Sequence, residues 1–397
     1  MFSKRTQWTR SPNPFALELE RKRQKGEAVI DLTLSNPTRC SFRYLKEDLL
    51  NALHNARGLI YEPHPQGLPE ARQAVRAYYD QKGIRLDLNQ IFLFSSTSEA
   101  YSAVFRLLTN PGDRVLIPQP SYPLLDYLIG LNDVTPCPYQ LVYRERWMMD
   151  LEDLDRGLSQ EPKVVVVVHP NNPTGHFTSG TEIPILLDRC RSKNAAVIAD
   201  EVFYDFVYDE TRLKLSSFAG TNQTLCFTLG GLSKTLGLPQ MKLSWMVITG
   251  PEDLRTEAIE RLEIFSDTYL SVNTPSQLAL ATWFHRRKEI QSEILDRVKT
   301  NLGQLQIQLE PHDFLQMLRC EGGWVATVKI DSKGSDEDLA LSVLRDENVL
   351  VYPGYFFGFD EEVYFVLSLL ERPPIFSEGI RRLTRRLSQI NKTSAIA

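Results

Sequence analysis

The sequence has few cysteines, no long hydrophobic run, no internal repeat and no strong excess of one charge. An odd number of cysteines is spread along 397 residues, at Cys40, Cys137, Cys190, Cys226 and Cys320. No two of them have CxxC spacing, so a reducing compartment is favoured over a disulfide framework. No apolar stretch is long enough to span a bilayer, and the basic first ten residues lack the apolar core of a signal peptide. We therefore expect a soluble, cytoplasmic protein.

The charge pattern gives no indication of a nucleic-acid partner. The formal net charge is −5, and acidic and basic residues are interspersed without a basic stripe or an acidic tail. The length suffices for a large α/β unit with a smaller partner domain. We expect a globular protein that binds neither nucleic acid nor a membrane.

Five predicted strands are followed closely by polar or aromatic residues. The unbroken β-branched run Val164–Val168 is typical of a central parallel strand that is covered on both faces. Helical patterns between most of the strands predict a doubly wound sheet, which binds ligands at the carboxyl ends of its strands. The strands and the residues after them are 91–94 with Ser96, Thr97 and Ser98, 114–117 with Tyr122, 164–168 with Asn172, 195–199 with Asp200, and 224–229 with Lys234.

Most of these residues also have a purely structural interpretation. Hydroxyls at a helix start form an anion site with the free N–H groups and the helix dipole, but Ser96 also fits a capping box with Glu99. Tyr122 can stack on a planar ring or pack in the core, and Asp200 can cap the next helix. Their convergence at one edge of the sheet favours a ligand site.

Lys234 follows two glycines by three residues and is surrounded by small and apolar residues. Burial disfavours the ammonium form and lowers the pKa of a lysine. The neutral amine is then a nucleophile that can form a Schiff base with an aldehyde. A single lysine is more often part of a surface loop, but the other four strand ends favour a reactive amine here.

The C-terminal part of the sequence predicts a second, smaller α/β domain. A long helix at 288–310 precedes strands at 322–330, 349–352 and 363–369, and a last helix follows at 381–389. The N-terminal segment, with a helix starting at Asn13-Pro14, is expected to join this domain. The predicted boundaries are 46–285 for the large domain and 13–45 with 286–397 for the small domain.

Six motifs in fixed order resemble the fold-type I pyridoxal-phosphate enzymes, the aspartate aminotransferase superfamily, over nearly the whole chain. The motifs are Tyr61 with Gly67-Leu68-Pro69-Glu70, Ser96-Thr97-Ser98-Glu99-Ala100, Pro120-Ser121-Tyr122-Pro123, Asn172-Pro173-Thr174-Gly175, Asp200-Glu201-Val202, and Ser233-Lys234 with Gly237-Leu238-Pro239. The resemblance implies that pyridoxal 5′-phosphate is held by Lys234 as a Schiff base.

The resemblance also implies roles for the other residues. Asp200 would pair with the ring nitrogen, Asn172 would donate to the phenolate oxygen, and Tyr122 would stack on the ring. Tyr61 would reach the phosphate of the neighbouring subunit, which implies a homodimer with shared sites. The phosphate ligands of the same chain would be Ser96, Thr97, Ser98 and Lys242, the last at a position where the family has arginine.

Two departures from the family pattern concern the ring and the substrate. Phe203 stands where a tyrosine usually donates to the phenolate oxygen, with Tyr204 one residue later. Val366 stands where an arginine usually clamps the substrate carboxylate. Arg39 is our candidate for that clamp, and Arg372 is the alternative.

The predicted activity is an aminotransferase that moves an amino group between an amino acid and a 2-oxo acid. A β-lyase or decarboxylase is the first alternative, because these classes share the same cofactor residues. A ligand-sensing domain of a transcription regulator is a remote alternative, since the stretch before Leu32 is too short for a helix-turn-helix domain. No metal site is predicted.

Overall fold

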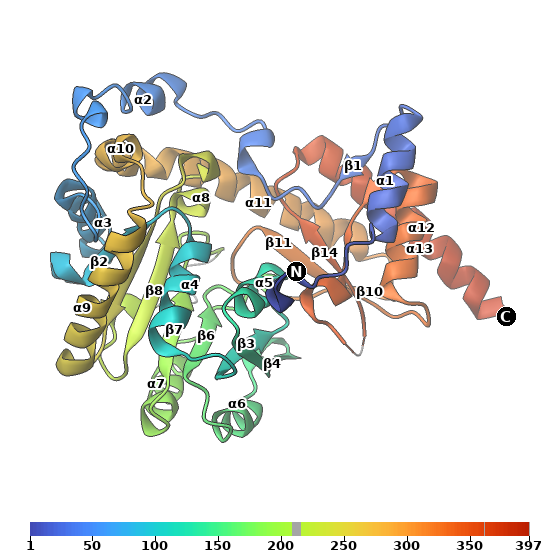
Figure 1. The fold of residues 1–397 in the computed structure, drawn as a ribbon. Coiled ribbons are helices and arrows are strands. Elements are labelled where there is room, and N and C mark those ends of the chain that lie inside the picture. The colour runs from blue at the N-terminus through green and yellow to red at the C-terminus, as the bar shows by residue number, and fades with distance from the viewer. Residues whose placement is uncertain (209–215, 361, 397) are drawn as a thin grey trace.

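The computed structural model describes residues 1–208, 216–360 and 362–396 (Figure 1). Its helices are α1 (Pro14–Gln24), α2 (Lys46–Asn51), α3 (Pro69–Asp80), α4 (Thr97–Leu108), α5 (Leu124–Leu131), α6 (Leu151–Leu158), α7 (Glu182–Ser192), α8 (Leu232–Thr235), α9 (Glu252–Tyr269), α10 (Thr274–His285), α11 (Arg287–Leu309), α12 (Asp336–Glu347) and α13 (Pro373–Ile396).

The strands fall into a large sheet and two smaller ones. The large sheet has the order β2-β9-β8-β7-β6-β3-β4-β5. Its strands are β2 (Ile91–Phe94), β3 (Arg114–Gln119), β4 (Thr135–Arg144), β5 (Arg146–Met149), β6 (Val164–Val168), β7 (Ala196–Asp200), β8 (Cys226–Gly231) and β9 (Ser244–Thr249). The smaller sheets contain β1 (Ile30–Asp31), β10 (Leu315–Met317), β11 (Val325–Ile330), β12 (Val349–Leu350), β13 (Tyr352–Pro353) and β14 (Val363–Ser368).

The centre of the large sheet is parallel and covered on both faces. Strands β4, β3, β6, β7 and β8 pair in parallel, and all five residues of β6 are buried. Helices α4, α5 and α9 pack in one hydrophobic cluster with the sheet, and α6 and α7 pack in another. The apolar residues of β6 alternate between these clusters, so the run of valines stabilises both interfaces.

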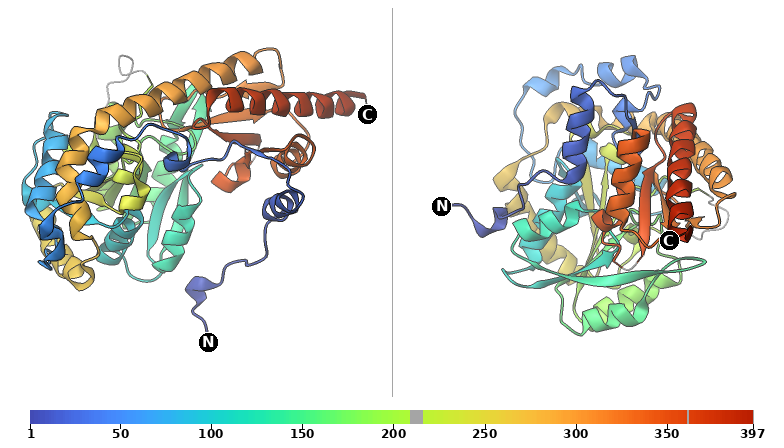
Figure 2. Two further views of the ribbon diagram at one scale, coloured as in Figure 1. Left: turned by 90° about the horizontal axis from the view of Figure 1, so that it is seen from above. Right: turned by 90° about the vertical axis from the view of Figure 1, so that its right-hand side faces the viewer.

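The smaller unit combines the two ends of the chain. The four-stranded antiparallel sheet β10-β11-β14-β13 belongs to it, and β1 pairs in parallel with β12 through Ile30 and Val349. Figure 2 shows the long helix α11 running from the large sheet to lie beside α13. The predicted fold class, a doubly wound large domain with a smaller α/β domain built from both termini, is confirmed.

Local sequence signals set several helix starts as expected. The Asn13 side chain accepts a hydrogen bond from Ala16 N at 2.7 Å, and Pro14 opens α1. Ser96 caps α4 by accepting from Glu99 N at 3.2 Å. The predicted elements omit β4, β5, β9 and β10, and β9 lies antiparallel between β2 and β8.

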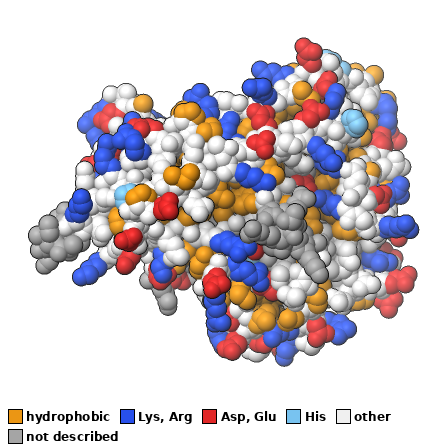
Figure 3. Space-filling model, turned by 180° about the vertical axis from the view of Figure 1, so that it is seen from behind, with side chains coloured by type: hydrophobic (Ala, Val, Ile, Leu, Met, Phe, Trp, Pro, Cys, Tyr) orange, Lys and Arg blue, Asp and Glu red, His pale blue; other side chains and the backbone are white. Residues whose placement is uncertain are grey.

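The surface has the mixed character that the composition predicts. Acidic and basic side chains are interspersed over the face seen in Figure 3, without a large area of one sign. Within the described residues, no helix is both long and apolar enough to cross a membrane.

Gly230→Ala should destabilise the strand that leads to Lys234. Gly230 is fully buried opposite Trp245, and a Cβ there would come within 2.5 Å of the Trp245 indole nitrogen. Overpacking of this kind costs about 1–3 kcal/mol, so the urea midpoint of unfolding should fall.

Gly303→Ala is the matched control. Gly303 is exposed in α11, and a Cβ there meets no atom within 4 Å, so alanine should leave stability equal or raise it by about 0.5–1 kcal/mol. Equal midpoints for Gly230→Ala and the wild type would contradict the packing argument.

Candidate active site

A pocket of about 570 Å³ lies at the carboxyl edge of the large sheet, facing the smaller unit. Eight predicted site residues line it, namely Ser96, Thr97, Ser98, Tyr122, Asn172, Asp200, Lys234 and Lys242. Asp200 is the last residue of β7, and the others come from loops and helix starts after β2, β3, β6 and β8, as the parallel arrangement requires. Tyr61 and Arg39 are not among the lining residues.

Lys234 lies in the short helix α8, directly after the buried strand β8. Its Nζ atom is 4.9 Å from the centroid of the Trp324 ring and 5.4 Å from that of the Phe203 ring. Burial lowers the pKa of Lys234 to about 8, and the negative charge of Asp200 opposes this shift. Roughly a tenth of the amine is therefore neutral at pH 7, enough for a nucleophile.

Asp200 is the last residue of β7 and is buried. The Tyr101 hydroxyl donates to its Oδ2 atom at 3.1 Å, and Val202 N donates to Oδ1 at 3.2 Å. Desolvation raises the pKa of Asp200 to about 6, while these hydrogen bonds and Lys234 limit the rise. The carboxylate therefore remains mostly ionised at pH 7, ready to pair with a cationic group in the pocket.

The start of α4 provides the anion site. Ser96 caps the helix, and Glu99 accepts from the backbone N and the hydroxyl of Ser95 at 2.7 and 2.6 Å. Ser96 is therefore the N-cap as expected, but the predicted capping box is only half formed, because Glu99 reaches Ser95 and not the Ser96 N–H. The N–H groups of Thr97 and Ser98 remain at the positive end of a helix of 12 residues. Lys242 lines the same pocket, and its own backbone has a φ of 48°, in the left-handed region.

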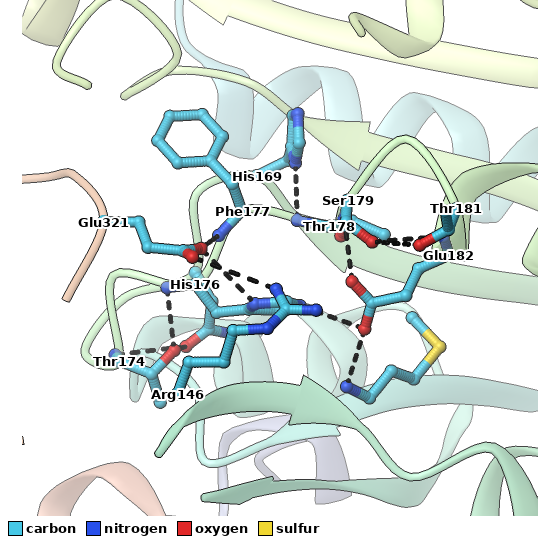
Figure 4. A network of polar contacts seen from close by, with 12 residues as sticks. Arg146, His169, Thr174, His176, Phe177, Thr178, Ser179, Thr181, Glu182 and Glu321 are labelled. Atoms are coloured by element: carbon cyan, nitrogen blue, oxygen red, sulfur yellow. Dashed lines mark hydrogen bonds and ion pairs between the residues drawn. The ribbon is translucent and has the colours of Figure 1, made fainter. Parts of the chain in front are cut away.

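The loop that carries Asn172 is fixed by a buried polar network (Figure 4). Thr174 donates its hydroxyl to Asn171 Oδ1 at 2.9 Å, and Glu321 accepts from Phe177 N at 3.1 Å. Glu182 accepts from Ser179 N at 2.8 Å. The Asn172 Oδ1 atom is buried and has no partner, so the side-chain amide is not committed to holding the loop.

His176 lies within this network between two carboxylates. Its Nε2 atom is 3.7 Å from Glu182, and its Nδ1 atom is 3.9 Å from Glu321 (Figure 4). Burial lowers the pKa of His176 to about 4, with Glu182 opposing the shift. The imidazole is therefore neutral at pH 7 and fills the space beside the loop without carrying charge.

Phe203 and Tyr204 point to different surroundings. Phe203 lines the pocket, whereas the Tyr204 ring lies 5.6 Å from the His169 ring and 6.1 Å from the Phe177 ring. Lys82 Nζ also lies over the Tyr204 ring at 4.6 Å. Tyr204 therefore packs against the loop network, and it does not take the place of the tyrosine that Phe203 replaces.

The two remaining predicted residues lie outside this pocket. The Tyr61 side chain is 80% exposed and lines a separate depression with Phe265 and Tyr269. Arg39 is exposed at the end of the short helix Pro37–Arg39, although Thr33 and Ser35 from the same segment do line the pocket. Their roles stay predictions.

Sequence reasoning missed the residues that close the pocket from the smaller unit. They are Trp324, Val325, Tyr352, Phe356, Phe357, Ser368 and Leu370. The pair of glycines before Trp324 was a usable signal, because a Cβ at Gly322 would come within 2.6 Å of the Phe177 ring. This close approach brings Trp324 towards the edge of the large sheet.

Comparison with known proteins gives one consistent result. The family model described as aminotransferase class I and II matches residues 30–366. The glutamate-pyruvate aminotransferase AlaA of Haemophilus influenzae is 27% identical over 387 residues, covering 94% of each chain. The alanine aminotransferase of Mycobacterium tuberculosis is 28% identical, covering 90% of this chain and 85% of the relative.

Solved structures have the same fold along the whole chain. An Escherichia coli aminotransferase superposes with a TM-score of 0.88 at 26% identity, covering 98% of both chains. The alanine aminotransferase from Pyrococcus furiosus superposes with a TM-score of 0.90 at 24% identity, covering 98% of this chain and all of that one.

Asp200→Asn should lower the pKa of Lys234 further, because it removes the negative charge that stabilises the ammonium form. The rate of Lys234 acylation, followed by peptide mass spectrometry across a pH series, should show a midpoint near 8 in the wild type. The midpoint should lie at lower pH in the variant.

Glu201→Gln is the matched control for this titration. Glu201 is the next residue, but its carboxylate accepts from Ser217 Oγ and Phe218 N, and it does not contribute to the shift of Lys234. The control should keep the wild-type midpoint. An unchanged or higher midpoint in Asp200→Asn would contradict the coupling.

Proposed function

The chain belongs to the class I and II aminotransferases, and we propose that Lys234 is the amine on which its amino-group transfer depends. The family model spans most of the chain, and the named relatives are aminotransferases. The protein is therefore a transaminase that moves an amino group between an amino acid and a 2-oxo acid. The same relatives favour transfer over the β-lyase and decarboxylase alternatives.

Class I and II aminotransferases use pyridoxal phosphate, and the residues of this pocket fit that cofactor. The fit is supported by an amine of lowered pKa, a buried carboxylate that is ionised at neutral pH, and a capped helix start with free N–H groups. The uncommitted Asn172 amide adds a hydrogen-bonding group for the ring. The single observation that carries the assignment is the buried Lys234 amine beside Asp200.

Each residue then has a defined task. When bound, the cofactor supplies an aldehyde carbon for the nitrogen and a ring that accepts electrons from the substrate α-carbon. Asp200 holds a proton on the ring nitrogen, and Tyr122 and Asn172 orient the ring. Ser96, Thr97, Ser98 and Lys242 bind the phosphate at the start of α4.

Lys234 acts twice in this proposal. Its neutral amine would hold the bound cofactor between turnovers and would be free while a substrate amine occupies that position. The freed amine would then act as a base that removes the proton from the substrate α-carbon. It would next act as an acid that delivers this proton to the former aldehyde carbon of the cofactor. Trp324 and Phe203 exclude water around Nζ, and this burial lowers the pKa of the amine to about 8, so a neutral fraction is available at neutral pH to take up that proton.

We further propose a cytoplasmic homodimer in which Tyr61 reaches the neighbouring pocket. Leu59, Ile60 and Tyr61 are 93%, 59% and 80% exposed, an apolar row that a second copy would cover. All five cysteines are free, which agrees with a reducing compartment.

Lys234→Ala should abolish turnover, with a loss of kcat of about 10²–10⁴-fold or more for the missing acid–base step alone. Transfer from an amino acid to pyruvate or 2-oxoglutarate is the assay, and cofactor absorbance after gel filtration reports binding. Exposed Lys163→Ala is the control and should keep wild-type rates. Wild-type turnover in Lys234→Ala would exclude the proposed role.

Arg39→Ala tests the source of the carboxylate clamp. If the segment of Thr33 and Ser35 carries Arg39 onto the substrate, the variant should have a lower kcat/KM. The fall should correspond to a loss of roughly 2–4 kcal/mol of transition-state stabilisation, with unchanged cofactor absorbance. Arg372→Ala is the comparison, since Arg372 is exposed and lies beside Glu371. An unchanged kcat/KM in Arg39→Ala for every productive substrate would show that Arg39 is not the clamp.

A further inference from the structure

The charged residues that line the pocket all lie on the side of the large sheet. Among the described lining residues they are Asp200, Lys234 and Lys242. The smaller unit contributes a surface that we call the apolar wall. It consists of Trp324, Val325, Tyr352, Phe356, Phe357 and Leu370. A ligand that fills the pocket therefore meets charge only on the side of the large sheet, and the smaller unit offers it aromatic and aliphatic side chains.

Two hydroxyl groups beside the apolar wall are already engaged in the fold. Ser368 donates its hydroxyl to the carbonyl of Leu34, and Thr33 donates its hydroxyl to Asp31 Oδ1. The Trp324 indole N–H is buried and has no partner, but one neutral donor replaces little of the hydration of a carboxylate. This end of the pocket is therefore poorly suited to a second negative charge.

The proposed function already uses the charges that are present. Lys234 bonds the cofactor, Asp200 pairs with the ring and Lys242 pairs with the phosphate. The α-carboxylate that every amino acid carries has Arg39 as its proposed partner. A carboxylate in the side chain would then find no cation within the described lining, and a buried unpaired carboxylate is costly.

We infer that the apolar wall is the side-chain subsite and that it selects amino acids with uncharged, apolar side chains over dicarboxylic ones. This inference rests on the proposed function and adds the substrate class to it. Aliphatic and aromatic side chains lose water against Trp324, Phe356 and Leu370, which is favourable. The side chain of glutamate would lose its hydration there without gaining a partner.

The first experiment compares substrates on the wild-type holoenzyme. We expect kcat/KM for leucine or phenylalanine, with pyruvate as acceptor, to exceed that for glutamate by about 100-fold or more, as when a rejected substrate leaves a charge unpaired. Glutamine separates charge from length and should react faster than glutamate. Equal or faster turnover of glutamate than of leucine and phenylalanine would overturn the inference.

The second experiment places a cation on the apolar wall. Phe356 is half-buried in the short helix Gly354–Phe357, so Phe356→Arg introduces a guanidinium at the wall without burying it fully. The ratio of kcat/KM for glutamate to that for leucine should rise at least about tenfold. An unchanged ratio in a folded, cofactor-loaded Phe356→Arg enzyme would overturn the inference.

Tyr355→Arg is the matched control on the same helix. The Tyr355 side chain is 42% exposed, its hydroxyl donates to Glu337, and it does not line the pocket. The control should keep the wild-type ratio. A shift as large as that of Phe356→Arg would show a long-range charge effect and would overturn the assignment of the subsite. If Phe356→Arg does not fold, the wild-type substrate comparison decides.

A binding measurement separates this inference from the proposed function. Calorimetry on the cofactor-loaded full-length protein should show tighter binding of 4-methylpentanoate than of glutarate, and the same order in Lys234→Ala. Turnover by Lys234→Ala would contradict the proposed function but would not change the expected order of binding of the two ligands. Equal or tighter binding of glutarate would contradict the assignment of the apolar wall as the side-chain subsite, but not the catalytic role of Lys234.

Discussion

The structure of the site depends on keeping the Lys234 amine out of water while leaving it accessible from one pocket. Strand β8 is buried along its whole length, and Lys234 follows it in a single helical turn against Trp324 and Phe203. Desolvation alone would lower the pKa of the amine further, and the Asp200 carboxylate limits the effect. The two groups thus tune each other, because Lys234 also limits the rise in the pKa of Asp200.

That balance requires rigid supports around both side chains. The loop from His169 to Phe177 is bonded to Glu321, and Glu321 lies three residues before Trp324. Glu321 N also donates to the Gly175 carbonyl at 3.1 Å. The same contacts therefore fix the Asn172 loop of the large sheet and the aromatic ring beside Lys234. A neutral His176 is suited to this place, because Arg146 already lies 3.9 Å from Glu321 and its charge helps to lower the pKa of His176.

The sequence was sufficient to predict the parts of the site that belong to strand ends. Five predicted strands are each followed by polar or aromatic residues, and these residues must meet at one edge once the strands align in a sheet. Eight predicted residues do line one pocket. Strand β9 was missed although Ser244–Thr249 is a buried, mainly apolar run, and it pairs with the nearby β8 as well as with the distant β2. Tyr61 and Arg39 are exposed and lie outside this pocket, so their roles stay predictions.

The same distinction explains why the reaction is easier to derive than the substrate. Chemistry requires particular groups at one sheet edge, and Asp200 and Lys234 satisfy that requirement within two neighbouring strands. The apolar wall, in contrast, is assembled from a loop before β11, strand β13, the helix at Gly354–Phe357 and the segment after β14. None of these residues carries a reactive group, so each looks like ordinary core until the pocket is formed. The absence of charge along this wall becomes apparent only in the assembled structure, and the proposed substrate class rests on it.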